Sequence, residues 1–148
     1  RDRLSTALAR VRRNGGRIAL LYVDLDRFKQ VNDTYGHGGG DQLLRAVADR
    51  LTACVRDTDT VARLGGDEFV VLLESIAEPE DAQRVVEKVR SAFEQPLSIT
   101  GHSLEIGMSI GIALYPEDGE AETQLLKQAD DRMYLMKARG GQQSVDCD

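Results

Sequence analysis

The segment RIALLYVDLD, residues 17–26, constrains the fold of this chain more than any other feature of the sequence. Apolar residues run without interruption from Ile18 to Val23, and Asp24 and Asp26 close the segment. A strand with apolar side chains on both faces belongs inside a sheet, because each face must be covered by another layer. The sequence therefore predicts an α/β domain with this strand near its centre.

Helical and strand patterns alternate through the rest of the chain. Apolar residues have helical spacing over residues 3–13, 27–55, 80–93 and 122–139, and the turn sequence YGHGGGD divides the second of these helices. TVARLGGDEFVVLLE predicts a hairpin, PLSITGHSLEI a small edge hairpin and GMSIGIALYP another buried strand. Asp41 is placed to cap the second part of the divided helix. This order predicts a βαββαβ centre and a mixed sheet with helices packed against it.

The composition is that of a single globular domain. The chain has 148 residues, of which 41% are apolar and 30% charged. Its 19 basic and 25 acidic residues give a formal charge of −6, which argues against binding nucleic acid or a membrane through a broad surface. The two cysteines, Cys54 and Cys147, form no disulfide framework or metal-ligand spacing, so reduced thiols in the cytoplasm are expected. Because the chain begins at Arg1 without a Met or a signal peptide, we expect it to be part of a longer protein.

Acidic residues gather where two predicted strands meet. Asp24 and Asp26 end the first strand, and Asp67 and Glu68 follow the glycine pair of the hairpin. In a βαββ unit these positions can lie side by side, where carboxylates repel one another unless a cation lies between them. With no Cys or His nearby, hard oxygen ligands favour Mg²⁺ or Mn²⁺ and phosphoryl or nucleotidyl transfer. The alternative is that two of the acids form the turn and the other two cap the next helix.

Four segments resemble the GGDEF domains, the diguanylate cyclases. LGGDEF matches the family signature, and DLDRFKQVNDTYGHGGGDQLL, SIGIALYP and ADDRMYLMK match further family segments in the right order. The resemblance implies a single GGDEF domain over residues 1–148, with a five-stranded mixed sheet related to the palm of adenylyl cyclases and polymerases. It also implies a reaction that joins two GTP molecules into cyclic di-GMP and releases two pyrophosphates. Each 3′-hydroxyl would attack the other nucleotide's α-phosphate across a homodimer, and an attached sensory or effector domain would lie outside this chain.

The resemblance also assigns the catalytic residues. Asp24, Asp67 and the backbone carbonyl of Leu25 would hold Mg²⁺ or Mn²⁺. Asp67 would activate the 3′-hydroxyl, with Glu68 beside it as a partner of the metal or of water. Lys29 would stabilise charge on the reacting phosphates, because the start of its helix suits a triphosphate. Without the surrounding motif, Lys29 would be interpreted as a solvated helix residue.

Further residues match the family's substrate positions. Asn32 and Asp41 match its guanine-binding residues, and a carboxylate there can accept from guanine N1–H and the exocyclic amine, whereas adenine offers an acceptor at N1. Phe28, His37 and Lys137 match positions near the substrate. The alternative interpretation makes Asn32 a turn residue, Asp41 a helix cap and His37 structural.

The sequence RDTD, Arg56 to Asp59, has the form and spacing of the family's R-x-x-D inhibitory site. There the product cyclic di-GMP would bind, with Arg pairing to phosphate and Asp accepting from guanine. A polar loop with no ligand is the alternative. The chain departs from the family at Gly141 and Gln142, where Arg and Asn are expected, and this leaves weaker GTP binding open. A non-catalytic module that binds GTP or cyclic di-GMP therefore stands as the competing hypothesis, and another palm-like nucleotidyl transferase as a third.

Overall fold

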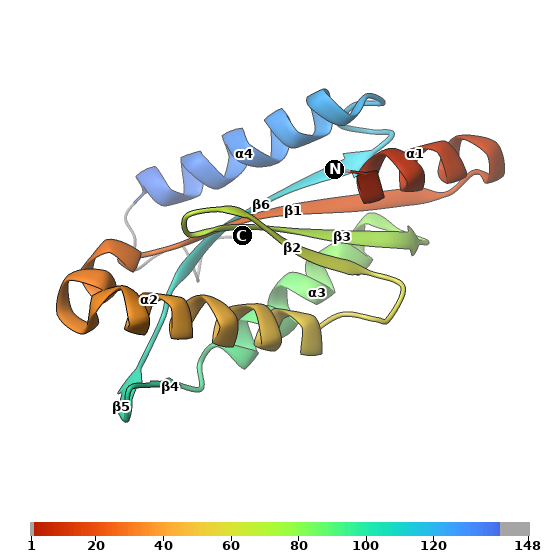
Figure 1. Cartoon of the computed structure of the whole chain (residues 1–148). Coiled ribbons are helices and arrows are strands. Elements are labelled where there is room, and N and C mark those ends of the chain that lie inside the picture. The colour runs from red at the N-terminus through yellow and green to blue at the C-terminus, as the bar shows by residue number, and fades with distance from the viewer. Residues whose placement is uncertain (1, 140–148) are drawn as a thin grey trace.

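The computed structural model describes residues 2–139 of the chain (Figure 1). Its helices are α1 (Asp2–Asn14), α2 (Phe28–Ala53), α3 (Pro79–Ala92) and α4 (Glu122–Ala138). Its strands are β1 (Arg17–Leu25), β2 (Thr60–Gly65), β3 (Glu68–Ile76), β4 (Leu97–Ile99), β5 (His102–Leu104) and β6 (Met108–Tyr115). The succession β1, α2, β2, β3, α3, β6 confirms the predicted βαββαβ centre. None of the described helices has the length and apolar character needed to cross a bilayer.

The main sheet differs from the expected one in two details. Among the described residues it has four strands in the order β2-β3-β1-β6, and each neighbouring pair is antiparallel rather than mixed. The reason is that each βαβ crossover passes over one strand, so β1 and β2 run in the same direction with β3 between them. The remaining hairpin, β4–β5, pairs only with itself. The α/β class and the helix-flanked sheet are as predicted.

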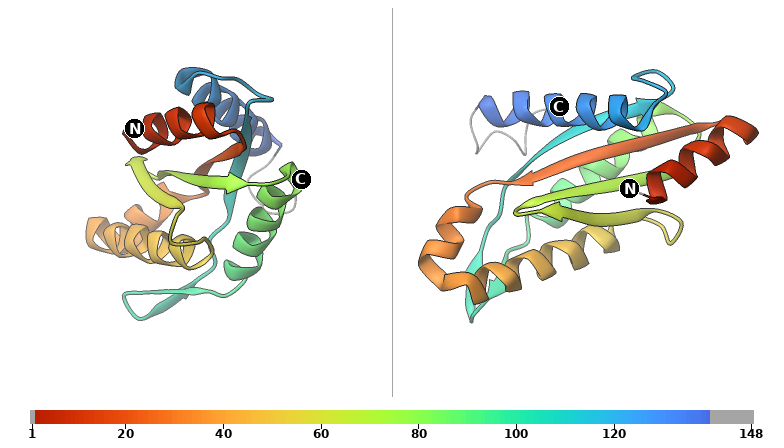
Figure 2. Two further views of the ribbon diagram at one scale, coloured as in Figure 1. Left: turned by 90° about the vertical axis from the view of Figure 1, so that its right-hand side faces the viewer. Right: turned by 45° about the horizontal axis from the view of Figure 1, so that its top comes forward.

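Two helical layers cover the sheet, as the two views in Figure 2 show. Leu21 and Val23 of β1 pack with residues of α2 and α3 in the larger core cluster. Leu20 packs with residues of α1 and α4 in the smaller one. Alternate side chains of β1 therefore enter different cores, which explains why its sequence is apolar without interruption.

Helix α2 consists of two arms joined at a kink. Gly36 at the kink has φ 76° and ψ 177°, a backbone conformation that glycine adopts without strain. The arms then approach closely, since a Cβ on Gly40 would lie 1.9 Å from Asn32 Oδ1. Asp41 lies within the second arm rather than at its start, so the predicted helix cap is wrong. The chain makes its turn at Gly36, earlier than the glycine run suggested.

Helix α4 packs directly on the backbone of β6. A Cβ on Gly111 would lie 2.0 Å from the carbonyl oxygen of Ala129 and 2.4 Å from the amide nitrogen of Met133. Only glycine permits this approach without movement of the helix. The close contact brings the last turn of α4, which carries Lys137, to the edge of the sheet where β1 ends.

Candidate functional site

The end of β1 and the turn between β2 and β3 meet at one edge of the sheet. Asp24 pairs across the sheet with Glu68 on β3 and with Ser109 on β6. The amide of Leu25 donates to the carbonyl oxygen of Asp67 at 3.1 Å, which joins β1 to the turn. The expected gathering of acidic residues from two separate segments is therefore present.

The turn itself depends on the glycine pair. Gly66 has φ 52°, in the left-handed region that side-chain-bearing residues avoid. Arg63 Nη1 donates to the carbonyl oxygen of Gly66 at 2.8 Å, which holds the turn from its β2 side. The turn places Asp67 directly before β3, whose following residues enter the core. The glycines thus make a tight and accessible turn, and the acids that follow lie at its end.

A lysine neutralises part of this acidic cluster. Lys137 Nζ lies 3.3 Å from Asp24 Oδ2 and 3.5 Å from Asp26 Oδ1. Asp26 Oδ1 also lies 3.4 Å from Ser109 Oγ, the donor of a long hydrogen bond. Both aspartates are buried, with 8% and 7% of their surface exposed. Two buried carboxylates therefore share one ammonium group.

Burial and repulsion make Asp24 an unusually weak acid. Burial, followed by the charge of Asp67, raises the pKa of Asp24 to about 6, although Lys137 acts in the opposite direction. Burial lowers the pKa of Lys137, but its pairing with Asp24 outweighs this and raises it above the ordinary value. Lys137 therefore remains charged at neutral pH. Its charge offsets only part of the effect that burial and Asp67 have on the pKa of Asp24.

The residues at this edge fit a hard divalent cation. Asp24 Oδ1 is buried and accepts no hydrogen bond, as expected of an oxygen kept for a charged ligand. No group of three or more His, Cys, Asp or Glu side chains within residues 2–139 could hold a metal ion. Two carboxylates, those of Asp24 and Asp67, lie close enough at this edge for the charge of one to raise the pKa of the other. Mg²⁺ is commonly bound by one or two carboxylates with substrate phosphates and water completing its shell.

Tyr22 contacts the cluster from the side of α4, and sequence reasoning missed it. Its hydroxyl donates to Glu68 Oε1 at 2.8 Å. Burial and then the bond to Glu68 raise the pKa of Tyr22 above its ordinary value, so the hydroxyl remains a donor. The signal in the sequence was its position two residues before Asp24, which places both side chains on the same face of β1.

The first arm of α2 begins beside the acids. Arg27, at its N-cap, has φ 63°, and no side chain caps the helix. The first intrahelical bond runs from Val31 N–H to the carbonyl of Arg27, so the amides of Phe28 to Gln30 have no partner within the helix. Free amides at a helix start are suited to bind phosphate. Lys29 is exposed on this turn and Phe28 packs partly against the core.

The predicted guanine-binding residues lie on the two arms of α2. Asn32 is half-buried on the first arm, with its amide oxygen against Gly40 on the second. Asp41, the next residue, is exposed, and so is His37 beside the kink. The structure thus brings Asn32 next to the segment that carries Asp41, and His37 is exposed one helical turn before Asp41.

Comparison with known proteins decides the family. A family model described as "Diguanylate cyclase, GGDEF domain" matches residues 1–143. This chain belongs to the GGDEF family. The resemblance found in the sequence is thereby confirmed.

Relatives of this GGDEF domain are longer proteins. It is 50% identical over 139 residues to the bifunctional diguanylate cyclase/cyclic di-GMP phosphodiesterase MucR of Pseudomonas aeruginosa, and the match covers 94% of this chain but 20% of MucR. The crystal structure of the GGDEF domain of TpbB (YfiN) from the same organism matches with a TM-score of 0.90 at 40% identity, over 94% of this chain and 87% of that one. The GGDEF domain of DgcB from Caulobacter crescentus, solved in complex with c-di-GMP, matches with a TM-score of 0.82 at 30% identity, over 94% of this chain and 82% of that one. The present chain therefore spans a small part of a full-length relative such as MucR.

The R-x-x-D segment of this GGDEF domain has one exposed and one buried member. Asp59 accepts from the amide nitrogens of Arg56 and Glu74, both at 3.0 Å, and its side chain is 2% exposed. The guanidinium of Arg56 also donates to Asp59, at 3.3 Å, and its side chain is 58% exposed. Asp59 is thus occupied within the protein, and Arg56 is the member open to a ligand. A groove of about 450 Å³ beside it is also lined by Arg84 and Lys88 of α3.

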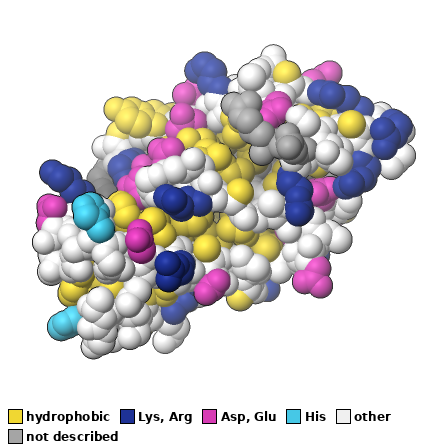
Figure 3. Space-filling model, viewed as in Figure 1, with side chains coloured by type: hydrophobic (Ala, Val, Ile, Leu, Met, Phe, Trp, Pro, Cys, Tyr) yellow, Lys and Arg dark blue, Asp and Glu magenta, His cyan; other side chains and the backbone are white. Residues whose placement is uncertain are grey.

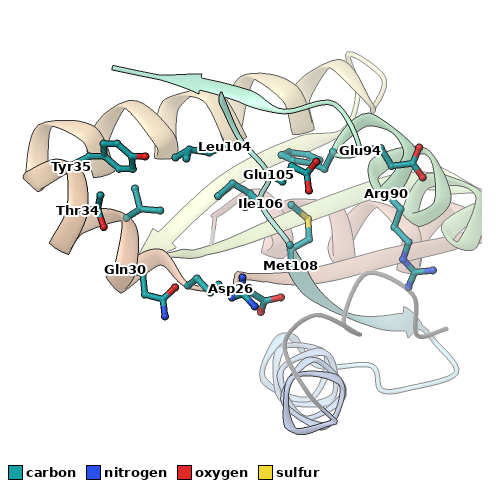
Figure 4. A pocket seen from close by; sticks show the side chains of 14 residues that line it. Asp26, Gln30, Thr34, Tyr35, Arg90, Glu94, Leu104, Glu105, Ile106 and Met108 are labelled. Atoms are coloured by element: carbon teal, nitrogen blue, oxygen red, sulfur yellow. The ribbon is translucent and has the colours of Figure 1, made fainter. Parts of the chain in front are cut away.

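A pocket of about 620 Å³ lies along the face of the first arm of α2 that carries Gln30 and Tyr35 (Figure 4). It runs from Asp26 along the arm toward α3 and has an apolar floor that includes Ile106 and Met108. Neither Asn32 nor Asp41 lines it. The predicted guanine-binding residues therefore face a different surface of the GGDEF domain. Gly141, Gln142 and Cys147 lie outside the described residues.

Proposed function

We propose that this GGDEF domain is a diguanylate cyclase that condenses two GTP molecules into cyclic di-GMP and two pyrophosphates. The observation that carries the proposal is the buried, unpartnered Oδ1 of Asp24 at the edge where β1 meets the Gly-Gly turn. Asp67 adds a second carboxylate there, and the uncapped start of α2 adds free amides. Nucleotidyl transfer uses carboxylates that bind a divalent cation and groups that bind the phosphates, and the start of a helix can bind phosphate.

The proposed division of roles follows from where each side chain lies. Asp24, Asp67 and the Leu25 carbonyl would hold Mg²⁺ or Mn²⁺, which when bound would stabilise charge developing on the α-phosphate. Asp67, on the exposed turn, would accept the proton of the attacking 3′-hydroxyl. Glu68, held by Tyr22, would orient water or the metal shell. The new P–O bond forms as the bond to pyrophosphate breaks, so each nucleotide loses one pyrophosphate.

Cationic groups would bind the triphosphate. The free amides at the start of α2 and the exposed Lys29 lie on the same turn of helix. Lys137 lies at the acids in this structure, and a flexible lysine can turn its ammonium group to a phosphate when a divalent cation replaces it there. Phe28 packs partly against the core at the same turn. This packing would hold the backbone amides of the turn in place for the triphosphate.

Guanine would be selected by the two arms of α2. Asn32 and Asp41 offer an amide and a carboxylate, and Gly40 allows their segments to approach within contact distance. Adenine would leave the carboxylate without its two hydrogen-bond donors. The kcat/KM for ATP would therefore be far lower than that for GTP. His37 is placed near the substrate only by the family match.

The reaction requires a homodimer. Ring closure needs the 3′-hydroxyl of each GTP to attack the α-phosphate of the other, so two loaded domains must face each other. The length of relatives such as MucR supports an attached domain elsewhere in the full protein that controls this encounter. We place the reaction in the cytoplasm, where its substrate GTP is made.

Cyclic di-GMP would bind as an inhibitor at Arg56, with Asp59 fixing the arginine. The exposed guanidinium beside the groove of Arg84 and Lys88 supports a phosphate contact. The same observation favours the second candidate function, a module that binds cyclic di-GMP without catalysis. A lysine already paired with Asp24, one of the candidate metal ligands, is consistent with that alternative.

Turnover of GTP separates the two functions. Protein at high concentration is incubated with GTP and Mg²⁺, and cyclic di-GMP is followed by chromatography. Asp67→Ala is expected to abolish the product with an unchanged fold, because Asp67 lies on a turn, while Glu87→Ala on the exposed face of α3 retains it. Normal turnover by Asp67→Ala would overturn the catalytic assignment. Absence of product from every variant, with cyclic di-GMP binding that Arg56→Ala removes, would establish the receptor instead.

A further inference from the structure

A β-bulge lies in β3 next to the R-x-x-D loop. Strand β3 pairs with β1 at Leu73 opposite Ala19 and at Ile76 opposite Arg17. Two residues, Glu74 and Ser75, thus oppose the single residue between those partners, and Ser75 has φ 60°. A bulge takes backbone groups out of the strand pairing and aims them elsewhere. Glu74 is the bulge residue whose backbone and side chain both make contacts outside the sheet.

The backbone of Glu74 holds the R-x-x-D loop. Its amide donates to Asp59 Oδ1 at 3.0 Å, and its carbonyl oxygen accepts from the guanidinium of Arg56. Arg56 and Asp59 also bond to each other. The orientation of the exposed guanidinium therefore depends on the position of this one bulge residue.

The side chain of Glu74 reaches in the opposite direction, to α1. Its carboxylate pairs with Arg10, and the Glu74 side chain is 15% exposed. Helix α1 also contacts the neighbouring strand, where Arg3 Nη1 donates to Thr60 Oγ1 at 3.4 Å. Figure 3 shows basic side chains grouped over α1. Arg10 of this helix reaches Glu74 on β3. One residue thus contacts α1 through its side chain and the R-x-x-D loop through its backbone.

We propose that Glu74 is a positioning residue that couples the orientation of α1 to ligand binding at Arg56. The inference rests on the proposed binding of cyclic di-GMP at that arginine. An incoming phosphate needs the guanidinium in the orientation that Asp59 and the Glu74 carbonyl fix, so binding and the position of the bulge depend on each other. Because Glu74 in the bulge also pairs with Arg10, ligand binding at Arg56 changes the ion pair that fixes α1 to β3. By linkage, a constraint on α1 changes the affinity at Arg56 by the same factor.

Binding of cyclic di-GMP by calorimetry tests the coupling. Arg10→Ala and Glu74→Gln each remove the ion pair and leave the Glu74 backbone in place. Each is expected to weaken binding by about 3- to 10-fold, at the lower end of allosteric couplings because Arg10 is half exposed. The double variant is expected to lose no more than either single one, since both act through one contact. Arg13→Ala, which changes an exposed arginine of the same helix, is the matched control and should bind as the parent does.

Hydrogen exchange of α1 supplies a reading that a merely structural role would not change. Cyclic di-GMP is expected to alter the exchange of α1 amides in the parent and in Arg13→Ala, and to leave it unaltered in Arg10→Ala and Glu74→Gln. If the parent binds cyclic di-GMP while affinity and exchange in both variants match it, the coupling is overturned and the product site remains. If the parent binds no cyclic di-GMP, the product site fails and the coupling fails with it.

Discussion

At the scale of single residues, the candidate site is a balance of charge around Asp24. This buried carboxylate has one oxygen near Lys137 and another with no partner, and Asp67 repels it from the turn. A protein keeps such an arrangement at a cost, because an ionised group in this environment is less well solvated than in the unfolded chain. The cost is measurable as a dependence of stability on pH.

The stability of the folded domain is expected to depend on the protonation of Asp24. The pKa of Asp24 is raised from 3.8 to about 6, so between these values the folded protein binds more protons than the unfolded one. Stability therefore falls as pH rises through this window, and the full penalty is present above it. Asp24→Asn carries no charge and is expected to be more stable than the parent at about pH 8, by up to about 3 kcal/mol. Below the window this advantage should disappear.

Urea unfolding in the presence of a chelator measures this difference. With saturating Mg²⁺ the order is expected to reverse, because a ligand that binds only the folded parent stabilises it. An advantage of Asp24→Asn that is the same at both ends of the pH range would show that charge on Asp24 is not its cause.

Motif spacing predicted which acids would meet, but not how they are held. Asp24 and Asp67 could be predicted as neighbours because each ends or begins a strand with a strong apolar pattern. Lys137 was expected near substrate, yet its ion pairs depend on the depth at which α4 packs, which no local pattern encodes. The position of Tyr22 two residues before Asp24 indicates a shared face of β1, but it does not indicate that the Tyr22 hydroxyl donates to Glu68.

At the scale of elements, α4 positions the candidate site from outside the motif. The helix rests on the backbone of Gly111, and Lys137 lies one turn beyond Met133, which touches that glycine position. Element types and order could be predicted from period and turn residues, whereas the antiparallel sheet order could not. Strand order depends on which faces the crossover helices cover, and this is decided by packing over the whole chain.

Substitution of Gly111 by alanine is expected to change that packing. Gly111→Ala would place a methyl group 2.0 Å from the carbonyl oxygen of Ala129, so α4 has to move away from β6. A loss of stability of about 1–3 kcal/mol is expected from the overpacking. Turnover should fall as well, because Lys137 moves with the helix. Gly38→Ala, at a position with open space around it, is the control. Unchanged unfolding and turnover in Gly111→Ala would mean that α4 yields without moving Lys137.

At the scale of the whole molecule, the proposed activity cannot belong to one copy of this domain. In the proposed reaction the acids, the start of α2 and its two arms would bind one GTP molecule, and each nucleotide would be both attacker and target. The domain carries its own two cores and a complete sheet, so folding and catalysis have different requirements. The proposed ring closure would need two copies of the domain.

The dependence of rate on protein concentration therefore tests the proposal at this scale. For a domain that is mainly monomeric, the productive species forms by encounter of two loaded copies, so the rate per protein should rise in proportion to concentration. It should reach a plateau only where sedimentation detects a dimer. Linking two copies through a flexible chain is expected to remove the dependence, because the linker sets an effective concentration in the millimolar range. A rate per protein that stays constant on dilution, in samples shown by sedimentation to be monomeric, would contradict a reaction between two domains and require both nucleotides to bind one copy.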